Sequence, residues 1–173
     1  MRFWAPAAIA YVVLLSAPAH AEVTPVDLQI AARALGFMER PLSGNVRLGI
    51  VFDPADQRSA GDATAIAKLL GDGVTAGNLV FKPVLMDINQ AMTAPIDAFF
   101  LPVGIKDHGM KISKATASRK LPCITLNIGQ VQDGNCVLGI QVLPKIEIYL
   151  SRAAAEGSDI TFVPVFRMMV TEF

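Results

Sequence analysis

The sequence predicts an α/β fold: a mostly parallel, doubly wound sheet (an α/β sandwich) with a C-terminal β-hairpin and a terminal helix. Three apolar runs carry this prediction, each followed by a loop and a helix-like segment, at residues 46–52, 79–85 and 97–104. Strands that are apolar on both faces are typical of parallel sheets covered by helices on each side. Right-handed crossovers then give the doubly wound arrangement.

The N-terminal elements have clear boundary signals. An amphipathic helix is expected over residues 25–38, because Thr24 is a good N-cap and Pro25 suits the first helical position. Pro41 ends this pattern. A second helix is expected over residues 56–70, where apolar residues recur at helical spacing before a glycine.

The middle of the chain continues the alternation of strands and helices. Pro83 marks the strand at 79–85 as an edge or bulged strand, since proline cannot donate a ladder hydrogen bond. The sequence further predicts a short helix at 87–92, a helix at 110–119, a strand at 121–126 and a turn-rich stretch at 129–135.

The pattern changes in the C-terminal part. Residues 136–142 and 145–150 are strand-like, and the alternation of the second run predicts an antiparallel hairpin with one solvated face. An Ala-rich turn at 152–156 leads to residues 160–170, which suit a terminal helix packed on the sheet, with Pro164 in its first turn.

The first 21 residues have the composition of a secretory signal peptide. Arg2 precedes an apolar run at residues 5–15, and an Ala-His-Ala end predicts cleavage after Ala21. The run is too short for a membrane anchor. We therefore expect a single domain at 22–173 that works in a bacterial periplasm.

Charge and cysteine content narrow the function classes. The chain has 15 basic and 15 acidic residues and no basic stripe, which argues against a nucleic-acid partner. Cys123 and Cys136 form an even pair, and an oxidising compartment favours a disulfide between them. The alternatives are two separately buried thiols or a thiolate pair for a soft metal.

No familiar catalytic or cofactor motif occurs in the chain. The dinucleotide, phosphate-loop, nucleophile-elbow and zinc-protease patterns are all missing, so neither an enzyme nor a cofactor is expected. His108 is interpreted as a solvated loop histidine, and the nearby Met110 does not make a specific metal pattern. An enzyme would have to rely on carboxylates such as Asp53 and Asp107.

Ligands of open α/β sheets bind outside the carboxyl ends of the strands, where the strand order reverses. Two of the loops predicted at that edge carry the most polar groups, the candidate ligand-binding residues Asp53, Gln57, Arg58, Ser59, Gly104, Lys106, Asp107 and His108. A helix N-terminus with a nearby cation would suit a small anion. The alternative is ordinary helix capping and solvated loop charge.

The chain resembles the YfiR family of periplasmic proteins. The stretches that carry the resemblance are AARALGFMERPLSGNVRLGIVFDP at 31–54, LPCITLNIGQ at 121–130 and the segment 136–169. Glu39-Arg40 stand where the family usually has an aromatic residue before the proline. The resemblance implies a non-enzymatic regulator of an inner-membrane signalling protein. The fold is also similar to one lobe of a periplasmic solute-binding protein.

Two functions follow as expectations. The first is a regulatory or binding protein that acts through a membrane partner, a small ligand, or both. Apolar residues near the C-terminus would form a surface for the partner or for a homodimer, with Phe162, Phe166, Met169 and Phe173 as candidates. The second is a small-anion receptor that delivers its ligand to a transporter of the ABC type.

Overall fold

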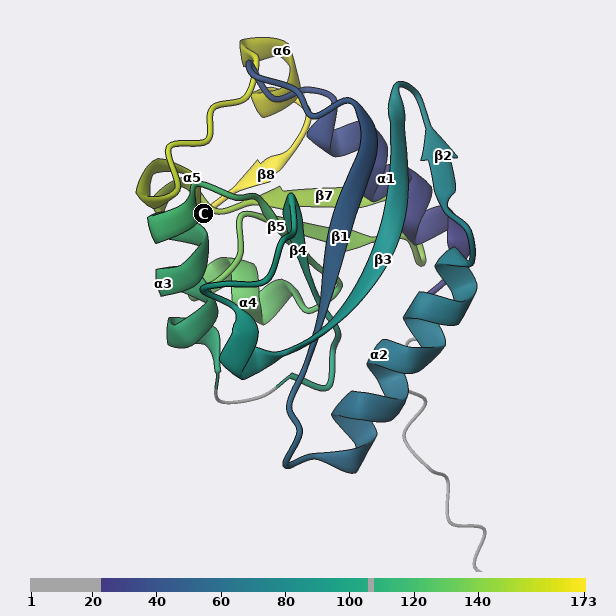
Figure 1. The fold of residues 1–173 in the computed structure, drawn as a ribbon. Helices are drawn as coiled ribbons and strands as arrows, with labels where there is room; N and C mark the ends of the chain where they lie inside the picture. The colour runs from purple at the N-terminus through teal and green to yellow at the C-terminus, as the bar shows by residue number, and fades with distance from the viewer. Residues whose placement is uncertain (1–22, 106–107) are drawn as a thin grey trace, which may run out of the picture.

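The computed structural model describes residues 23–105 and 108–173. At its centre lies an eight-stranded sheet of order β2-β3-β1-β4-β5-β6-β7-β8 (Figure 1). The strands are β1 (Gly44–Phe52), β2 (Val74–Ala76), β3 (Leu79–Asp87), β4 (Ala98–Leu101), β5 (Cys123–Thr125), β6 (Leu138–Gln141), β7 (Glu147–Leu150) and β8 (Thr171–Glu172). The helices are α1 (Pro25–Leu35), α2 (Gln57–Leu70), the 3-10 helix η1 (Ile88–Gln90), α3 (Gly109–Arg119), α4 (Ile128–Gln132), α5 (Arg152–Gly157) and α6 (Pro164–Arg167).

The sheet is parallel through its centre, as the sequence predicts. Strand β1 pairs in parallel with β3 on one side and β4 on the other, and the parallel pairing continues through β5 to β6. Antiparallel pairing is confined to β2 with β3 and to β6 with β7, while β8 runs parallel to β7. The α/β fold class is therefore confirmed.

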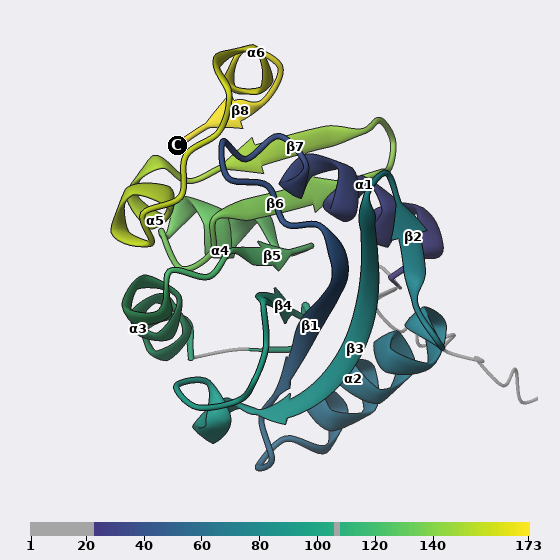
Figure 2. The same cartoon turned by 45° about the horizontal axis from the view of Figure 1, so that its top comes forward.

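Both faces of the sheet are buried at its centre, and β4 shows this most directly. Ala98 and Phe100 point into a core shared with α1 and α2, whereas Phe99 and Leu101 point into a second core shared with α3. Figure 2 shows α1 and α2 on one side of the sheet and α3 on the other. The apolar run of β4 is continuous because alternate residues serve different cores.

The C-terminal part contains the expected hairpin but a shorter helix. Leu138 pairs with Leu150 and Ile140 with Ile148 across the antiparallel β6 and β7. The helix expected over residues 160–170 is reduced to α6, and the chain then extends into β8 beside β7. Phe173 N–H donates to the Leu150 carbonyl, so sheet pairing ends the helix early.

Several short elements differ from the prediction. Helix α4 (Ile128–Gln132) occupies the first half of the turn-rich stretch predicted at 129–135, and the Ala-rich turn predicted at 152–156 forms the helix α5. Helix α1 ends at Leu35, because Met38 forms a β-bridge with Phe162 instead. The edge prediction for Pro83 fits, since β2 pairs only with residues 79–81 of β3 and leaves Pro83 beyond that pairing.

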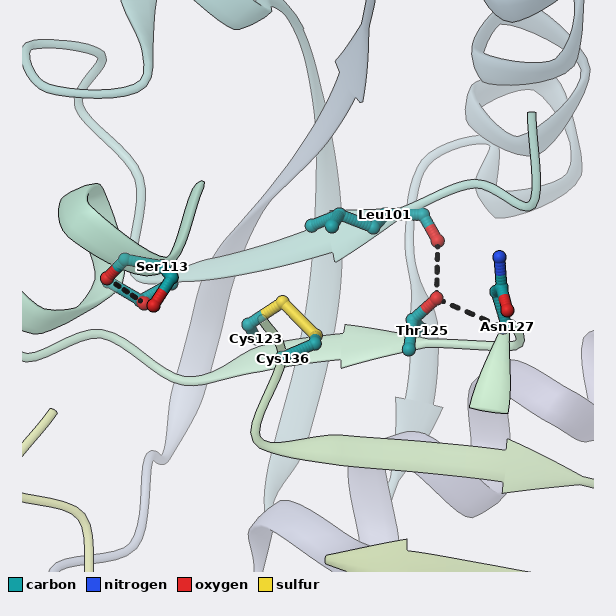
Figure 3. The surroundings of a disulfide bond; sticks show 7 residues. Leu101, Ser113, Cys123, Thr125, Asn127 and Cys136 are labelled. Atoms are coloured by element: carbon teal, nitrogen blue, oxygen red, sulfur yellow. Dashed lines mark hydrogen bonds between the residues drawn. A yellow bond between two sulfur atoms is a disulfide. The ribbon is translucent and has the colours of Figure 1, made fainter. Parts of the chain in front are cut away.

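A disulfide joins Cys123 to Cys136, as expected for this cysteine pair (Figure 3). It connects the start of β5 to the segment just before β6, and both cysteines are fully buried. The alternatives, two separate thiols or a pair of metal ligands, are thereby excluded. A buried bond at this point fixes the register between two neighbouring strands.

Candidate functional site

The strand order brings two loops together at the carboxyl edge of the sheet. From β1 the chain passes through α2 to β3 on one side, and then crosses back to β4 on the other side of β1. Helix α2 follows β1 on one face and α3 follows β4 on the opposite face. The carboxyl ends of β1 and β4 thus flank the switch point, the usual ligand position in this architecture.

A side-chain contact spans this switch point. His108 Nε2 lies 2.9 Å from Oδ2 of Asp53, and both side chains are partly buried. The other Asp53 oxygen, Oδ1, accepts a hydrogen bond from the Ala55 backbone N–H at 2.9 Å. The bond to His108, helped by that of Ala55, holds the pKa of Asp53 below its ordinary value. Asp53 is therefore held in its ionised form.

Two more predicted residues join this contact. Ser59 Oγ accepts the Asp53 backbone N–H at 3.0 Å, and the Ser59 side chain is fully buried. A β-carbon at Gly104 would lie 2.8 Å from Asp62 Oδ2 and 3.9 Å from Ser59 Cα, so the loop after β4 packs closely against α2, and a side chain there would displace the Asp62 carboxylate. The structure therefore brings together Asp53, Ser59, Gly104 and His108.

The remaining predicted residues are not part of that cluster. Gln57 and Arg58 are exposed, and no side-chain hydrogen bond of either is seen within the described ranges. The Arg58 backbone N–H donates to Asp56, the N-cap of α2, as in the helix-capping interpretation. Lys106 and Asp107 lie outside the described residues.

Sequence reasoning missed two residues of this edge, Lys111 and Asn89. Lys111 Nζ donates to Asn89 Oδ1 at 2.6 Å, and the charge of Lys111 contributes to the lowered pKa of Asp53. Lys111 lies in the first turn of α3 and could have been noticed for its charge. Asn89 lies in η1 directly after β3, which also follows the carboxyl end of a predicted strand, but its hydrogen bond with Lys111 depends on the strand order and could not be predicted.

A cavity of about 390 Å³ adjoins the start of α3, lined by Ile105, Gly109, Met110, Asn127, Gln130, Asp133 and Asn135. Asn127 caps α4, whereas α3 has no side-chain cap because His108 turns to Asp53. Thr125 supports this edge: its hydroxyl donates to the Leu101 carbonyl and accepts from the Asn127 N–H (Figure 3). The arrangement can bind a small polar molecule.

The candidate partner residues divide into core and surface. Phe162 and Phe166 are only 4% and 1% exposed, and Phe166 stacks between Phe162 and Phe37, with ring centroids 5.0 and 5.1 Å away. Their assignment to a partner surface is corrected: they belong to the core, because the aromatic stack covers them. Met169 and Phe173 are exposed, and Phe173 stacks on Tyr149.

An apolar groove of about 420 Å³ lies beside Met169. We call it the β7 groove; it is lined by Phe37, Lys145, Ile146, Glu147, Ile148, Phe166, Met169, Val170 and Thr171. Ile146 and Met169 are 60% and 63% exposed, although both are large apolar side chains. Large apolar side chains that lie together and exposed at the surface of a folded domain are typical of an interaction site.

No family model matches this chain, and no curated protein matches it. The YfiR-like assignment therefore stays a prediction. Within residues 23–105 and 108–173, no group of three or more His, Cys, Asp or Glu side chains could hold a metal ion. In the same part of the chain, no helix combines the length and apolar character needed to cross a membrane.

Proposed function

We propose that this protein is a non-enzymatic regulator in the periplasm that acts by binding an inner-membrane signalling protein. The observation that carries the proposal is the β7 groove, in which exposed Ile146 and Met169 flank a stacked pair, Phe37 and Phe166. When a partner buries such side chains, the complex is stabilised by about 25 cal/mol for each Å² of apolar surface removed from water.

The groove has the composition of a contact site. Its base is rigid, because Phe166 is fully buried and its ring is held between two other rings. Met169 is flexible and can adapt to the shape of a partner. At the rim, Lys145 Nζ and Glu147 Oε1 form an ion pair at 2.6 Å. An apolar centre with a polar rim is the usual anatomy of a protein interface.

The compartment and partner class rest on separate support. The predicted signal peptide at 1–21 directs the chain out of the cytoplasm. The disulfide is compatible with an oxidising compartment. The YfiR-like resemblance adds a membrane signalling protein as the class of partner.

Glutamate substitutions in the groove test this proposal. Ile146→Glu and Met169→Glu place a charge in the contact and should abolish capture of the partner in a crosslinking pull-down from intact periplasm. Leu85→Glu is the matched control, since Leu85 is also an exposed apolar residue, on β3, and does not line the groove. All three variants should keep the circular dichroism spectrum of the wild type.

Two outcomes would overturn the proposal. One is a strictly monomeric wild type, by analytical ultracentrifugation, that captures no partner. The other is a homodimer that Met169→Glu converts to monomers, which would assign the groove to a second copy of the chain.

A small-anion receptor is the second candidate function. The cavity at the start of α3 supports it, because the side-chain amides of Asn127, Gln130 and Asn135 line it and can donate hydrogen bonds to an anion. Gly109→Ala would disturb this cavity, since a β-carbon there meets the Asn135 side chain. Native mass spectrometry of protein purified from periplasm should then show a retained small anion on the wild type and none on the variant.

A further inference from the structure

A separate cavity of about 510 Å³ lies between α5, α6 and β8, the yellow elements in Figure 2. We call it the α5–α6 cavity. Its volume falls within the range of about 300–1,000 Å³ that is typical of small-molecule sites. It shares no lining residue with the β7 groove or with the cavity at the start of α3. The functions proposed above therefore make no use of it.

The inner wall of this cavity is apolar. It is formed by Leu150, Ala155, Ile160 and Phe162, all of which are buried. The apolar part of a ligand in this cavity would therefore contact side chains that already belong to the main hydrophobic core. This wall favours a ligand with a hydrocarbon or aromatic body.

Backbone hydrogen bonds hold the walls in place without a ligand. Glu39 N–H donates to the Thr161 carbonyl at 2.9 Å, and Val163 N–H donates to the Phe37 carbonyl at 3.0 Å. These bonds tie the segment after α1 to the segment before α6. A preformed cavity loses little conformational entropy when a ligand binds.

The two arginines at the rim, Arg152 and Arg167, both lie beside the carboxylate of Glu172. Arg167 binds Glu172 through two hydrogen bonds, Nε to Oε1 at 2.7 Å and Nη2 to Oε2 at 3.0 Å. Arg152 Nε lies 3.6 Å from the same Oε2. The Arg167 hydrogen bonds lower the pKa of Glu172, which is therefore ionised and neutralised within the protein.

Two further carboxylates, Glu39 and Glu156, line the exposed rim and form no ion pair within the part of the chain that the structure describes. Glu39 accepts a hydrogen bond from the Thr161 hydroxyl at 3.0 Å. Glu156 lies close enough to add to the raised pKa of Arg167, which is caused chiefly by Glu172. Among the described residues of the lining, Glu39, Glu156 and Glu172 stand against Arg152 and Arg167, so the net charge of these five side chains is negative.

We propose that the α5–α6 cavity is a binding site for an apolar organic cation, an amine with a hydrocarbon or aromatic body. The ammonium group lies at the rim between Glu39 and Glu156, and the body lies on the inner wall. Anionic and neutral compounds of the same shape lack the interaction with the carboxylates.

Phenethylamine, 2-phenylethanol and 3-phenylpropionate are suitable probes, because they share a phenyl body and differ in charge. Titrated into the ¹⁵N-labelled mature chain, phenethylamine should shift the amide signals of α5, α6 and residues 160–163. It should bind at least tenfold more tightly than 2-phenylethanol, and 3-phenylpropionate should bind most weakly. Added salt should weaken the binding of phenethylamine but not that of 2-phenylethanol, because salt screens the attraction between the ammonium group and the carboxylates.

Variants of the rim separate charge recognition from simple apolar binding. Glu39→Gln and Glu156→Gln should each weaken phenethylamine by about fivefold and leave 2-phenylethanol unchanged. Asp72→Asn, an exposed carboxylate outside the cavity, is the control and should change neither. Equal affinities for the amine and the alcohol, tighter binding of the acid, shifts confined to other elements, or no binding at all would each overturn the proposal.

Discussion

His108 Nε2 lies 2.9 Å from Oδ2 of Asp53, and this contact connects the loop after β1 to the N-cap residue of α3. The two residues are 55 positions apart in the sequence. They meet because β4 lies directly beside β1, with β3 on the opposite side. The contact therefore follows from the strand order, which places the two loops side by side at the switch point.

His108→Ala should raise the pKa of Asp53 towards its ordinary value, because the hydrogen bond from His108 is the largest cause of the lowered value. Carboxyl ¹³C chemical shifts across an acid titration measure this pKa directly. Lys111→Ala should give a smaller rise, since Lys111 acts on Asp53 only through its charge. An Asp53 pKa that is the same in His108→Ala and wild type would contradict the account.

The stabilising effect of ionised Asp53 should disappear in acid. Because folding lowers its pKa, Asp53 contributes stability above the ordinary value of 3.8, and this contribution is lost as the pH falls through the lowered pKa. Urea unfolding of the wild type and Asp53→Asn between roughly pH 5 and pH 2 tests this. The difference in unfolding free energy between the wild type and Asp53→Asn should become smaller as the pH is lowered. A gap that stays constant would show that Asp53 has the same pKa in both states.

The disulfide should account for a large part of the stability. A loop with a sequence separation of 13 residues is closed by this bond. Replacement of both Cys123 and Cys136 by alanine should lower the unfolding free energy by about 3 kcal/mol, from the greater entropy of the open unfolded chain. Chemical denaturation under non-reducing conditions measures the difference. Reductant should then destabilise the wild type and leave the double variant unchanged, and an equal response of both would contradict the prediction.

Two glycine substitutions should change stability in opposite directions. A β-carbon at Gly49 in β1 would lie 2.7 Å from both Ile96 Cδ1 and Met86 Sδ, so Gly49→Ala should cost about 1–3 kcal/mol by overpacking. A β-carbon at Gly61 in α2 would meet nothing within 4 Å, so Gly61→Ala should stabilise by about 0.5–1 kcal/mol. Thermal unfolding of the two variants provides the comparison. The same sign of change in both would contradict this packing.

The central parallel strands could be predicted from the sequence because both of their faces are buried. The run at 97–104 is apolar without alternation, and β4 indeed supplies one core with Phe100 and the other with Phe99. The short strands β2 and β8 could not be predicted, since their three and two residues are not part of a longer apolar run, unlike the equally short β5 within residues 121–126. Tertiary pairing alone defines them.

The candidate site could be predicted only in part. The position of Asp53 after a strand follows from the sequence, but its pairing with His108 depends on a strand order that no local pattern encodes. The partner surface could also be predicted only in part, because exposure depends on contacts between residues that are far apart in the sequence. Phe166 has the same local apolar character as Met169, yet stacking against Phe37, far away in the sequence, buries only the phenylalanine.

Site-specific photocrosslinking in living cells tests the central claim, that the β7 groove binds a membrane signalling protein. A photoreactive residue at position 146, in the groove, is compared with one at position 85, which is exposed but outside it. The account predicts a crosslink to an inner-membrane protein from position 146 and none from position 85. The same products from both positions, or a crosslink from position 146 only to a second copy of the chain, would contradict it.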